Sequence, residues 1–204
     1  MTIWLISDTH FYHAAMLGFL RPDGTRVRHE FDSVDQMNAT MIERWNAAVK
    51  PQDHVYHLGD VSMKVSSTVT ANLVRSLHGH KRLVRGNHDR HTTSQYLRMG
   101  FEEIHGMKLL SRVWLTHAPL HPTSLGRALG NVHGHIHAQP SPSGPYLNVC
   151  VEQTDYAPIS LEQAEARLSQ IRASEDDDHH GQLSQPRPMY ALQSPLIRST
   201  LEDV

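Results

Sequence analysis

The sequence has a single cysteine, Cys150. One thiol can form no internal disulfide and cannot build a zinc cage by itself, so the chain fits a reducing compartment. An apolar run of roughly 20 residues, the length that spans a bilayer, is also missing. Met1 leads directly into an apolar segment, without the basic region or the cleavage site of a secretory signal. We therefore expect a cytoplasmic protein with no membrane partner.

Charge of one sign is not in excess either. The 19 Lys and Arg residues nearly balance the 21 Asp and Glu residues, which gives a formal net charge of −2 at pH 7. Proteins that coat nucleic acid are strongly basic because they neutralise phosphates, so this composition argues against nucleic acid as a general partner. Histidine stands out instead, with 17 residues in the chain.

Apolar segments alternate with helical patterns in the first half of the chain. Residues 2–6, 54–58 and 82–84 are short and apolar, as expected of buried strands. Between them, residues 33–49 and 69–77 carry apolar side chains at helical spacing. Further strands are expected closer together in the second half. This order of elements predicts a layered α/β domain with a mixed sheet.

The last predicted strand, residues 146–151, is followed by a helix that begins near Ser160 and has one apolar face. After Arg172 the chain becomes acidic and then rich in Pro, Gln and Ser. Such a composition buries too little apolar surface to order itself. We therefore expect one domain over residues 1–172 and a disordered tail over residues 173–204.

Five short polar clusters each follow an apolar run. They supply three Asp, one Asn and five His, which are enough to hold two metal ions. In an open sheet the carboxyl ends of the strands lie along one crevice, so clusters that are distant in the sequence are expected to converge. The clusters are Asp8-Thr9-His10, Gly59-Asp60, Gly86-Asn87-His88-Asp89, Thr116-His117 and Gly134-His135-Ile136-His137.

These residue types suit hydrolysis at phosphorus. Carboxylate and imidazole ligands bind first-row divalent metals, and one carboxylate can bridge two of them. Such ions acidify water and neutralise the phosphoryl oxygens. His88 follows a predicted ligand and is placed to donate a proton to the leaving group, while Asp89 could hold the His88 ring in the required tautomer. A plain turn or cap role for Asp89 is nearly as good an interpretation.

The clusters, in this order, resemble those of the calcineurin-like metallophosphoesterase superfamily, in particular its small bacterial and phage-type members. The resemblance extends from residue 2 to about residue 150. It implies a four-layer α/β/β/α sandwich of two mixed sheets flanked by helices, and a dinuclear site. One metal would be held by Asp8, His10, Asp60 and His137. The other would be held by the bridging Asp60 together with Asn87, His117 and His135. His88 would contact the phosphate and assist the leaving group.

The sequence therefore predicts a dinuclear-metal-dependent phosphoester hydrolase, with a metal-bridging hydroxide as nucleophile and His88 as general acid. Mn²⁺ is the expected metal, with Fe, Zn, Ni or Co as alternatives. The loops over residues 11–32 and 118–130 contain few aromatic residues, which favours a small, anionic, nucleotide-like phosphodiester over a lipid. Their arginines are Arg21, Arg26, Arg28 and Arg127.

Several alternatives stay open at this point. The same centre could serve a phosphomonoesterase or a nuclease, and a non-catalytic scaffold could retain the fold. His13 and Arg21 are candidate substrate contacts, although a packed histidine and a surface arginine are the simpler interpretations. No pattern in the sequence predicts the oligomeric state.

Overall fold

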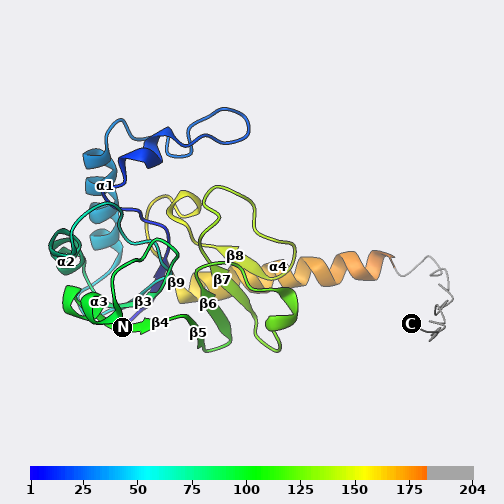
Figure 1. Ribbon diagram of the computed structural model, residues 1–204. Coiled ribbons are helices and arrows are strands. Elements are labelled where there is room, and N and C mark those ends of the chain that lie inside the picture. Colours follow the sequence, from blue (N-terminus) through cyan, green and yellow to red (C-terminus); the bar gives the residue numbers. More distant parts are fainter. Residues whose placement is uncertain (183–204) are drawn as a thin grey trace, which may run out of the picture.

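Two β-sheets lie at the centre of the structure, a computed structural model that describes residues 1–182 (Figure 1). The larger sheet has five strands in the order β4-β3-β2-β1-β9. Strands β1 to β4 are parallel to one another, and β9 is antiparallel to β1. These strands are β1 (Ile3–Ile6), β2 (His54–His57), β3 (His80–Val84), β4 (Phe101–His105) and β9 (Ile159–Ser160).

The smaller sheet has four strands in the order β5-β6-β7-β8. Strand β5 is antiparallel to β6, whereas β6, β7 and β8 are parallel. Both sheets are therefore mixed, as expected. The strands are β5 (Met107–Leu110), β6 (Val113–Thr116), β7 (Gly130–His133) and β8 (Tyr146–Asn148).

Four α-helices and three short 3₁₀ segments complete the described part of the chain. Helix α1 begins where predicted, because the Ser33 hydroxyl caps it by accepting a hydrogen bond from the Gln36 backbone N–H. The helices are α1 (Val34–Ala48), α2 (Ser67–Ser76), α3 (Thr93–Met99) and α4 (Leu161–Gln182). The 3₁₀ segments are η1 (Ala14–Gly18), η2 (Pro122–Ser124) and η3 (Val151–Gln153).

Helices α1, α2 and α3 cover one face of the larger sheet. Ile6 and Val55 on this face pack with Trp45 of α1 in one core cluster. Next to them, Leu83 of β3 packs with apolar side chains of α2 and α3, including Met99. Since side chains alternate between the two faces of a strand, the residues between these positions point to the opposite face.

That opposite face packs on the smaller sheet. Leu5 and Leu58 lie in one buried cluster with Leu115 and Val132, which come from the second sheet. Helix α4 contacts β1, β8 and β9 and contributes Leu168 to the same cluster. The architecture is the expected α/β/β/α arrangement of two mixed sheets with helices.

Helix α4 is longer than the sequence predicted. It continues past Arg172 to Gln182, so residues 173–182, which were assigned to a disordered tail, are helical. No proline interrupts this stretch, and the helix runs beyond the sheets (Figure 1). The rest of the predicted tail, residues 183–204, lies outside the described residues. Within residues 1–182, no helix combines the length and the apolar character needed to cross a membrane.

The packing of α4 leads to a testable prediction. Leu168 is fully buried, so Leu168→Ala should lower the free energy of unfolding by about 2–5 kcal/mol through lost apolar contacts and an unfilled cavity. Urea denaturation measures this change. Gln170→Ala, on the exposed side of the same helix, is the control and should change stability by no more than about 0.5 kcal/mol. Equal effects of the two substitutions would contradict the packing described for α4.

Candidate metal centre

The predicted ligands follow strands of both sheets. Asp8 and His10 come after β1, and Asp60 comes after β2. Asn87 follows β3 of the same sheet, whereas His117 follows β6 of the smaller one. His135 and His137 follow β7. The five clusters do converge, because the carboxyl ends of the strands in the two packed sheets meet at one edge of the sandwich.

The backbone at these positions is strained. Most of the predicted ligands have a left-handed backbone, which L-amino acids rarely adopt and which costs of order 1–3 kcal/mol for each non-glycine residue. The φ angles are 58° at Asp8, 46° at His10, 59° at Asp60, 72° at His135 and 49° at His137. Strain concentrated on one set of polar side chains indicates that their positions serve the site.

Two glycines let the ligand loops approach each other closely. A side chain at Gly86 would collide with the Asp60 carboxylate, and one at Gly134 would collide with the Asp8 carboxylate and with Ser7. These positions explain why the clusters contain glycine next to the polar residues. Because glycine has no side chain, the loops after β3 and β7 can lie directly against those after β2 and β1.

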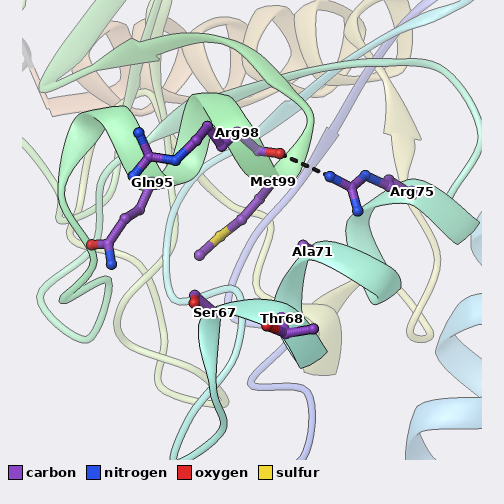
Figure 2. Close-up of a pocket in the computed structure, with 7 residues that line it drawn as sticks. All are labelled: Ser67, Thr68, Ala71, Arg75, Gln95, Arg98 and Met99. Carbon is purple, nitrogen blue, oxygen red and sulfur yellow. Dashed lines mark hydrogen bonds between the residues drawn. The ribbon is translucent and has the colours of Figure 1, made fainter.

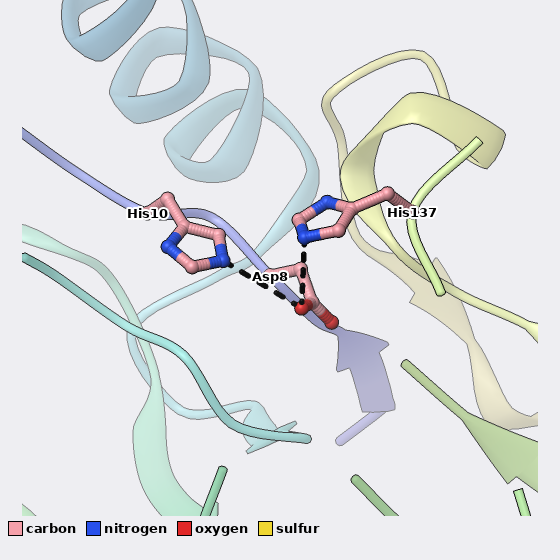
Figure 3. A group of neighbouring side chains, drawn as sticks. All are labelled: Asp8, His10 and His137. Carbon is pink, nitrogen blue, oxygen red and sulfur yellow. Dashed lines mark ion pairs between the residues drawn. The ribbon is translucent and has the colours of Figure 1, made fainter. Parts of the chain in front are cut away.

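The first ligand group consists of Asp8, His10 and His137 (Figure 3). The Oδ1 atom of Asp8 lies 3.7 Å from His10 Nε2 and 3.7 Å from His137 Nε2. Although Asp8 Oδ1 and both His10 ring nitrogens are buried, they have no hydrogen-bond partner among the residues that the structure describes. Buried polar atoms without partners are costly, so these atoms fit a bound cation.

Asp60 links this group to a second one. Its Oδ2 atom lies 3.5 Å from His10 Nε2 and also 3.5 Å from His117 Nε2. The other oxygen, Oδ1, accepts a hydrogen bond from the His88 backbone N–H at 2.8 Å, which fixes the orientation of the carboxylate. One Asp60 oxygen is thus directed between two imidazoles that come from different sheets.

The second group surrounds His117. Its Nδ1 atom lies 2.8 Å from the Leu58 carbonyl oxygen, and because a carbonyl only accepts, Nδ1 carries the proton. Nε2 therefore presents a lone pair to Asn87 Oδ1 at 2.8 Å and lies 3.2 Å from His135 Nδ1. With Asp60 Oδ2 also nearby, several electron-rich atoms face one another. A cation among them satisfies all of these atoms, and the donor set therefore fits a second metal.

The site keeps the Asp8 carboxylate ionised. Burial alone would raise the pKa of the Asp8 carboxyl, but His10, His137 and His117 together lower the pKa below its ordinary range. For the His137 ring, burial alone would lower the pKa, but the interaction with Glu152 raises the pKa above its ordinary value. Asp8 is therefore charged at neutral pH, as a metal ligand needs to be.

Two residues that the sequence analysis did not assign to the site hold it in place. Arg28 is fully buried and donates hydrogen bonds to the backbone carbonyls of Asp8, at 2.7 Å, and Thr9, at 2.9 Å. It also donates to Glu152 Oε1 at 2.8 Å, and the same oxygen lies 3.1 Å from His137 Nδ1. In the sequence, the only feature that could have indicated Glu152 is its position just after the last predicted strand. No sequence feature indicated that Arg28 is buried.

Three of the loop arginines make internal contacts. Arg28 is the buried residue just described. Arg21 donates to the Val27 carbonyl at 3.3 Å, and Arg26 donates to the Phe31 carbonyl at 3.2 Å, so both hold their own loop. Arg28, which the sequence analysis counted only among the arginines of this loop, is therefore engaged in internal contacts. The prediction that Arg21 contacts the substrate stays a prediction, and its guanidinium group is engaged within the loop.

His13 lies beside the first ligand group. Its ring centroid is 5.5 Å from that of His10, and its side chain is buried. Burial is the main reason why the pKa of His13 falls to about 4, with nearby positive groups adding to the effect. The structure therefore brings His13 to the site as a packed, neutral imidazole.

His88 and Asp89 have separate surroundings. The His88 ring is 5.5 Å from the His10 ring and belongs to neither ligand group. The Asp89 carboxylate accepts hydrogen bonds from the backbone N–H groups of Gly86, Asp60 and Val61 and from the Tyr96 hydroxyl, at 2.8–3.1 Å. The prediction that Asp89 orients the His88 ring is wrong, because both of its oxygens hold the loops after β2 and β3.

Two cavities lie near these loops. One, of about 400 Å³, includes His88 in its wall. The other, of about 260 Å³, lies between α2 and α3, where Arg75 donates to the Arg98 carbonyl (Figure 2). Among the described residues neither cavity is lined by a predicted metal ligand, but the first includes the predicted general acid His88 and the second includes no predicted site residue. The lining residues of the first are Ser62, Met63, Lys64, Val65, His88, Arg90 and His91.

Comparison with known proteins supports this view of the site. The chain matches the family described as calcineurin-like phosphoesterase over residues 1–192. An uncharacterized protein of Methanocaldococcus jannaschii is 34% identical over 168 residues, which is 78% of this chain and 87% of that relative. The Gene 66 protein of Mycobacterium phage L5 is 32% identical over 92 residues, 42% of this chain and 39% of the phage protein.

A solved structure has a similar fold. A protein of unknown function from Aquifex aeolicus is 25% identical, with a TM-score of 0.64 over 81% of this chain and 98% of that one. The nuclease MPE of Pseudomonas putida has a TM-score of 0.43 and 19% identity, over 66% of this chain and 61% of its own. Since the family match includes every polar cluster at the strand ends, the chain belongs to the calcineurin-like phosphoesterase family.

Proposed function

We propose that this protein hydrolyses phosphoesters with two divalent metal ions that share Asp60. Its family consists of phosphoesterases, which generally hold divalent metals in a dinuclear site. The observation that carries the proposal is the Asp60 Oδ2 atom, 3.5 Å from an imidazole nitrogen of each ligand group. A carboxylate in this position can bridge two ions about 3.5–4 Å apart.

The proposed ligands offer oxygen and imidazole nitrogen, which favours Mn²⁺ or another first-row divalent ion. When bound, the two ions would acidify the attacking water and neutralise the phosphoryl oxygens. Cys150 is not proposed as a ligand, because burial raises the pKa of its thiol and the thiol donates to Asp8 Oδ2 at 3.2 Å. The first ion would be held by Asp8, His10, Asp60 and His137. The second would be held by Asp60, Asn87, His117 and His135.

His88 is proposed as the general acid. Its backbone N–H is bound to Asp60, which holds the residue beside the phosphoryl position, while its ring lines the neighbouring cavity. Within residues 1–182 the Nδ1 atom of this ring has no hydrogen-bond partner, so the ring is not committed to a structural contact through that atom. A protonated His88 would give its proton to the leaving oxygen as the phosphoester bond breaks.

A phosphodiester is the favoured substrate class. The cavity of about 400 Å³ beside His88 offers room for a second ester group, which a monoester does not need. A phosphomonoesterase is the second candidate, because the same centre can handle both kinds of ester. Nucleotide-like substrates suit a cavity whose wall carries Lys64 and Arg90 and contains no acidic residue.

The proposal predicts metal-dependent turnover that needs Asp60. Purified protein with Mn²⁺ should hydrolyse bis-p-nitrophenyl phosphate, and a chelator should abolish the reaction. Asp60→Ala removes the carboxylate between the two ligand groups, so metal content, measured by mass spectrometry, and activity should both collapse. Asp35→Ala, at an exposed position in α1, is the matched control.

Two results would overturn this prediction. Turnover of neither monoesters nor diesters with Mn²⁺, Fe²⁺, Co²⁺, Ni²⁺ or Zn²⁺ would contradict the enzyme assignment. A kcat/KM for nucleoside monophosphates or sugar phosphates more than about tenfold above that for every diester would contradict the diester preference, as tenfold corresponds to about 1.4 kcal/mol.

A second prediction separates His88 from the metal ligands. His88→Ala should retain both metals but lower kcat by roughly 10²–10⁴-fold for poor leaving groups, the usual contribution of general acid catalysis. The defect should be smaller for p-nitrophenolate, which leaves without a proton. His80→Ala, at an exposed position at the start of β3, is the control. Loss of a metal ion from the His88 variant would show that His88 is a ligand.

A third prediction concerns Asp89. Its carboxylate accepts four hydrogen bonds, so Asp89→Asn would turn an amide N–H₂ toward groups that are themselves donors. The free energy of unfolding in chelator should fall by about 1–3 kcal/mol. Asp35→Asn is the control for charge. Native stability together with a loss restricted to poor leaving groups would instead indicate that Asp89 acts through His88.

A further inference from the structure

We propose that the cavity beside His88 binds a second phosphate group of the substrate, with Lys64 and Arg90 as its cationic contacts. This inference rests on the proposed function, because the first phosphate would occupy the metal centre. It narrows the substrate class to nucleotide esters that carry a further phosphate beyond the one that is cleaved. Neither residue belongs to the ligand groups described above.

The cavity is formed by two loops that follow adjacent parallel strands. Residues 62–65 follow β2, and residues 88–91 follow β3. Because β2 and β3 are paired in parallel register, their carboxyl ends lie side by side and the two loops face the same space. His88 belongs to this wall, and its ring centroid is 5.5 Å from that of His10, so the cavity lies next to the proposed metal centre.

The charges in this cavity are available for a ligand. Lys64 and Arg90 are exposed, and within residues 1–182 neither side chain forms an ion pair or a hydrogen bond. The nearest carboxylates are already engaged: Asp60 faces two imidazoles, and Asp89 accepts four hydrogen bonds. An incoming phosphate would therefore meet two positive charges without first breaking a native contact.

The cavity wall is held in position before any ligand arrives. The Arg85 guanidinium donates to the backbone carbonyls of Asp89 and His91, at 2.7 and 2.9 Å, and lies over the Tyr96 ring. On the other side, the Met63 backbone N–H donates to the Phe11 carbonyl at 3.1 Å. A wall fixed by such contacts loses little freedom on binding, which favours affinity for a charged group.

The test compares substrates that differ only by a second phosphate. The first is thymidine 5′-(p-nitrophenyl phosphate) with a free 3′-hydroxyl, the second carries a 3′-phosphate, and the third carries a 3′-phosphodiester to another thymidine. With Mn²⁺, the wild-type kcat/KM for at least one of the two 3′-phosphorylated substrates should exceed that for the first substrate by roughly tenfold or more. Comparing these two arms distinguishes a terminal phosphate from an internal diester of an oligonucleotide.

Lys64→Gln combined with Arg90→Gln should remove this preference, so that kcat/KM for the phosphorylated substrates falls to within about twofold of the value for the first substrate. Lys50→Gln combined with Arg112→Gln removes the same charge from exposed positions outside the cavity and should preserve the preference. If the two double variants behave alike, a general effect of net charge explains the result and the inference fails.

Calorimetry keeps this inference separate from the proposed function. Thymidine 3′,5′-bisphosphate should bind the Mn²⁺-loaded wild-type protein more tightly than thymidine 5′-monophosphate does, and the cavity variant should lose the difference. If that difference is found without turnover of any ester, the proposed function fails and the phosphate site stands. Equal affinity of the wild-type protein for the two nucleotides would overturn the phosphate site, whether or not esters are hydrolysed.

Discussion

The Asp60 carboxylate is the group on which the rest of the site depends. One oxygen is held by a backbone N–H, and the other is directed between imidazoles from the two sheets, each 3.5 Å away. The atoms around it are acceptors rather than donors, so in the folded chain they repel one another and leave buried polar groups unsatisfied. Folding produces this arrangement only because the packing of the two sheets is strong enough to impose it. Positive charge at the centre would remove the repulsion, and this is the physical reason for assigning the site to metal ions.

The surrounding structure offsets the cost of that arrangement. Asp89 binds the backbone of the loops after β2 and β3, and the Arg28–Glu152 pair binds the backbone at Asp8 and the His137 ring. These contacts hold residues in left-handed conformations that an isolated loop would leave. Each brace is a buried charge with several partners, so removal of one partner leaves the others unpaired. The site is therefore stabilised by groups that do not themselves contact a metal or a substrate.

The two sheets contribute differently to the proposed metal centre and to the proposed recognition cavity beside His88. The proposed metal ligands come from strand ends of both sheets, whereas the cavity beside His88 is built from loops of the larger sheet. Changes in the loops at 62–65 and 88–91 would alter what is recognised without moving the ligands from the smaller sheet. Helix α4 lies on the opposite side of this arrangement, against β1, β8 and β9, where it contributes to the core.

The sequence by itself determined the strand-and-helix order and the residues that converge, because alternation of apolar side chains and polar clusters after strands are local patterns. It also identified the family. It did not determine the roles of Arg28, which was counted only among the loop arginines, and of Asp89, which was interpreted as a partner of His88. Their partners are distant in the sequence or belong to the backbone, as with Glu152, 124 residues from Arg28. The sequence analysis ended the ordered chain at residue 172, before the end of α4, for a related reason. The composition of a segment indicates how little apolar surface it can bury, but not whether a packed helix continues into it. Only the tertiary structure decided which charges are buried and engaged, because burial depends on which loops the packing of the two sheets brings together. In the part of the chain that the structure describes, Lys64 and Arg90 are exposed and form no ion pair or hydrogen bond.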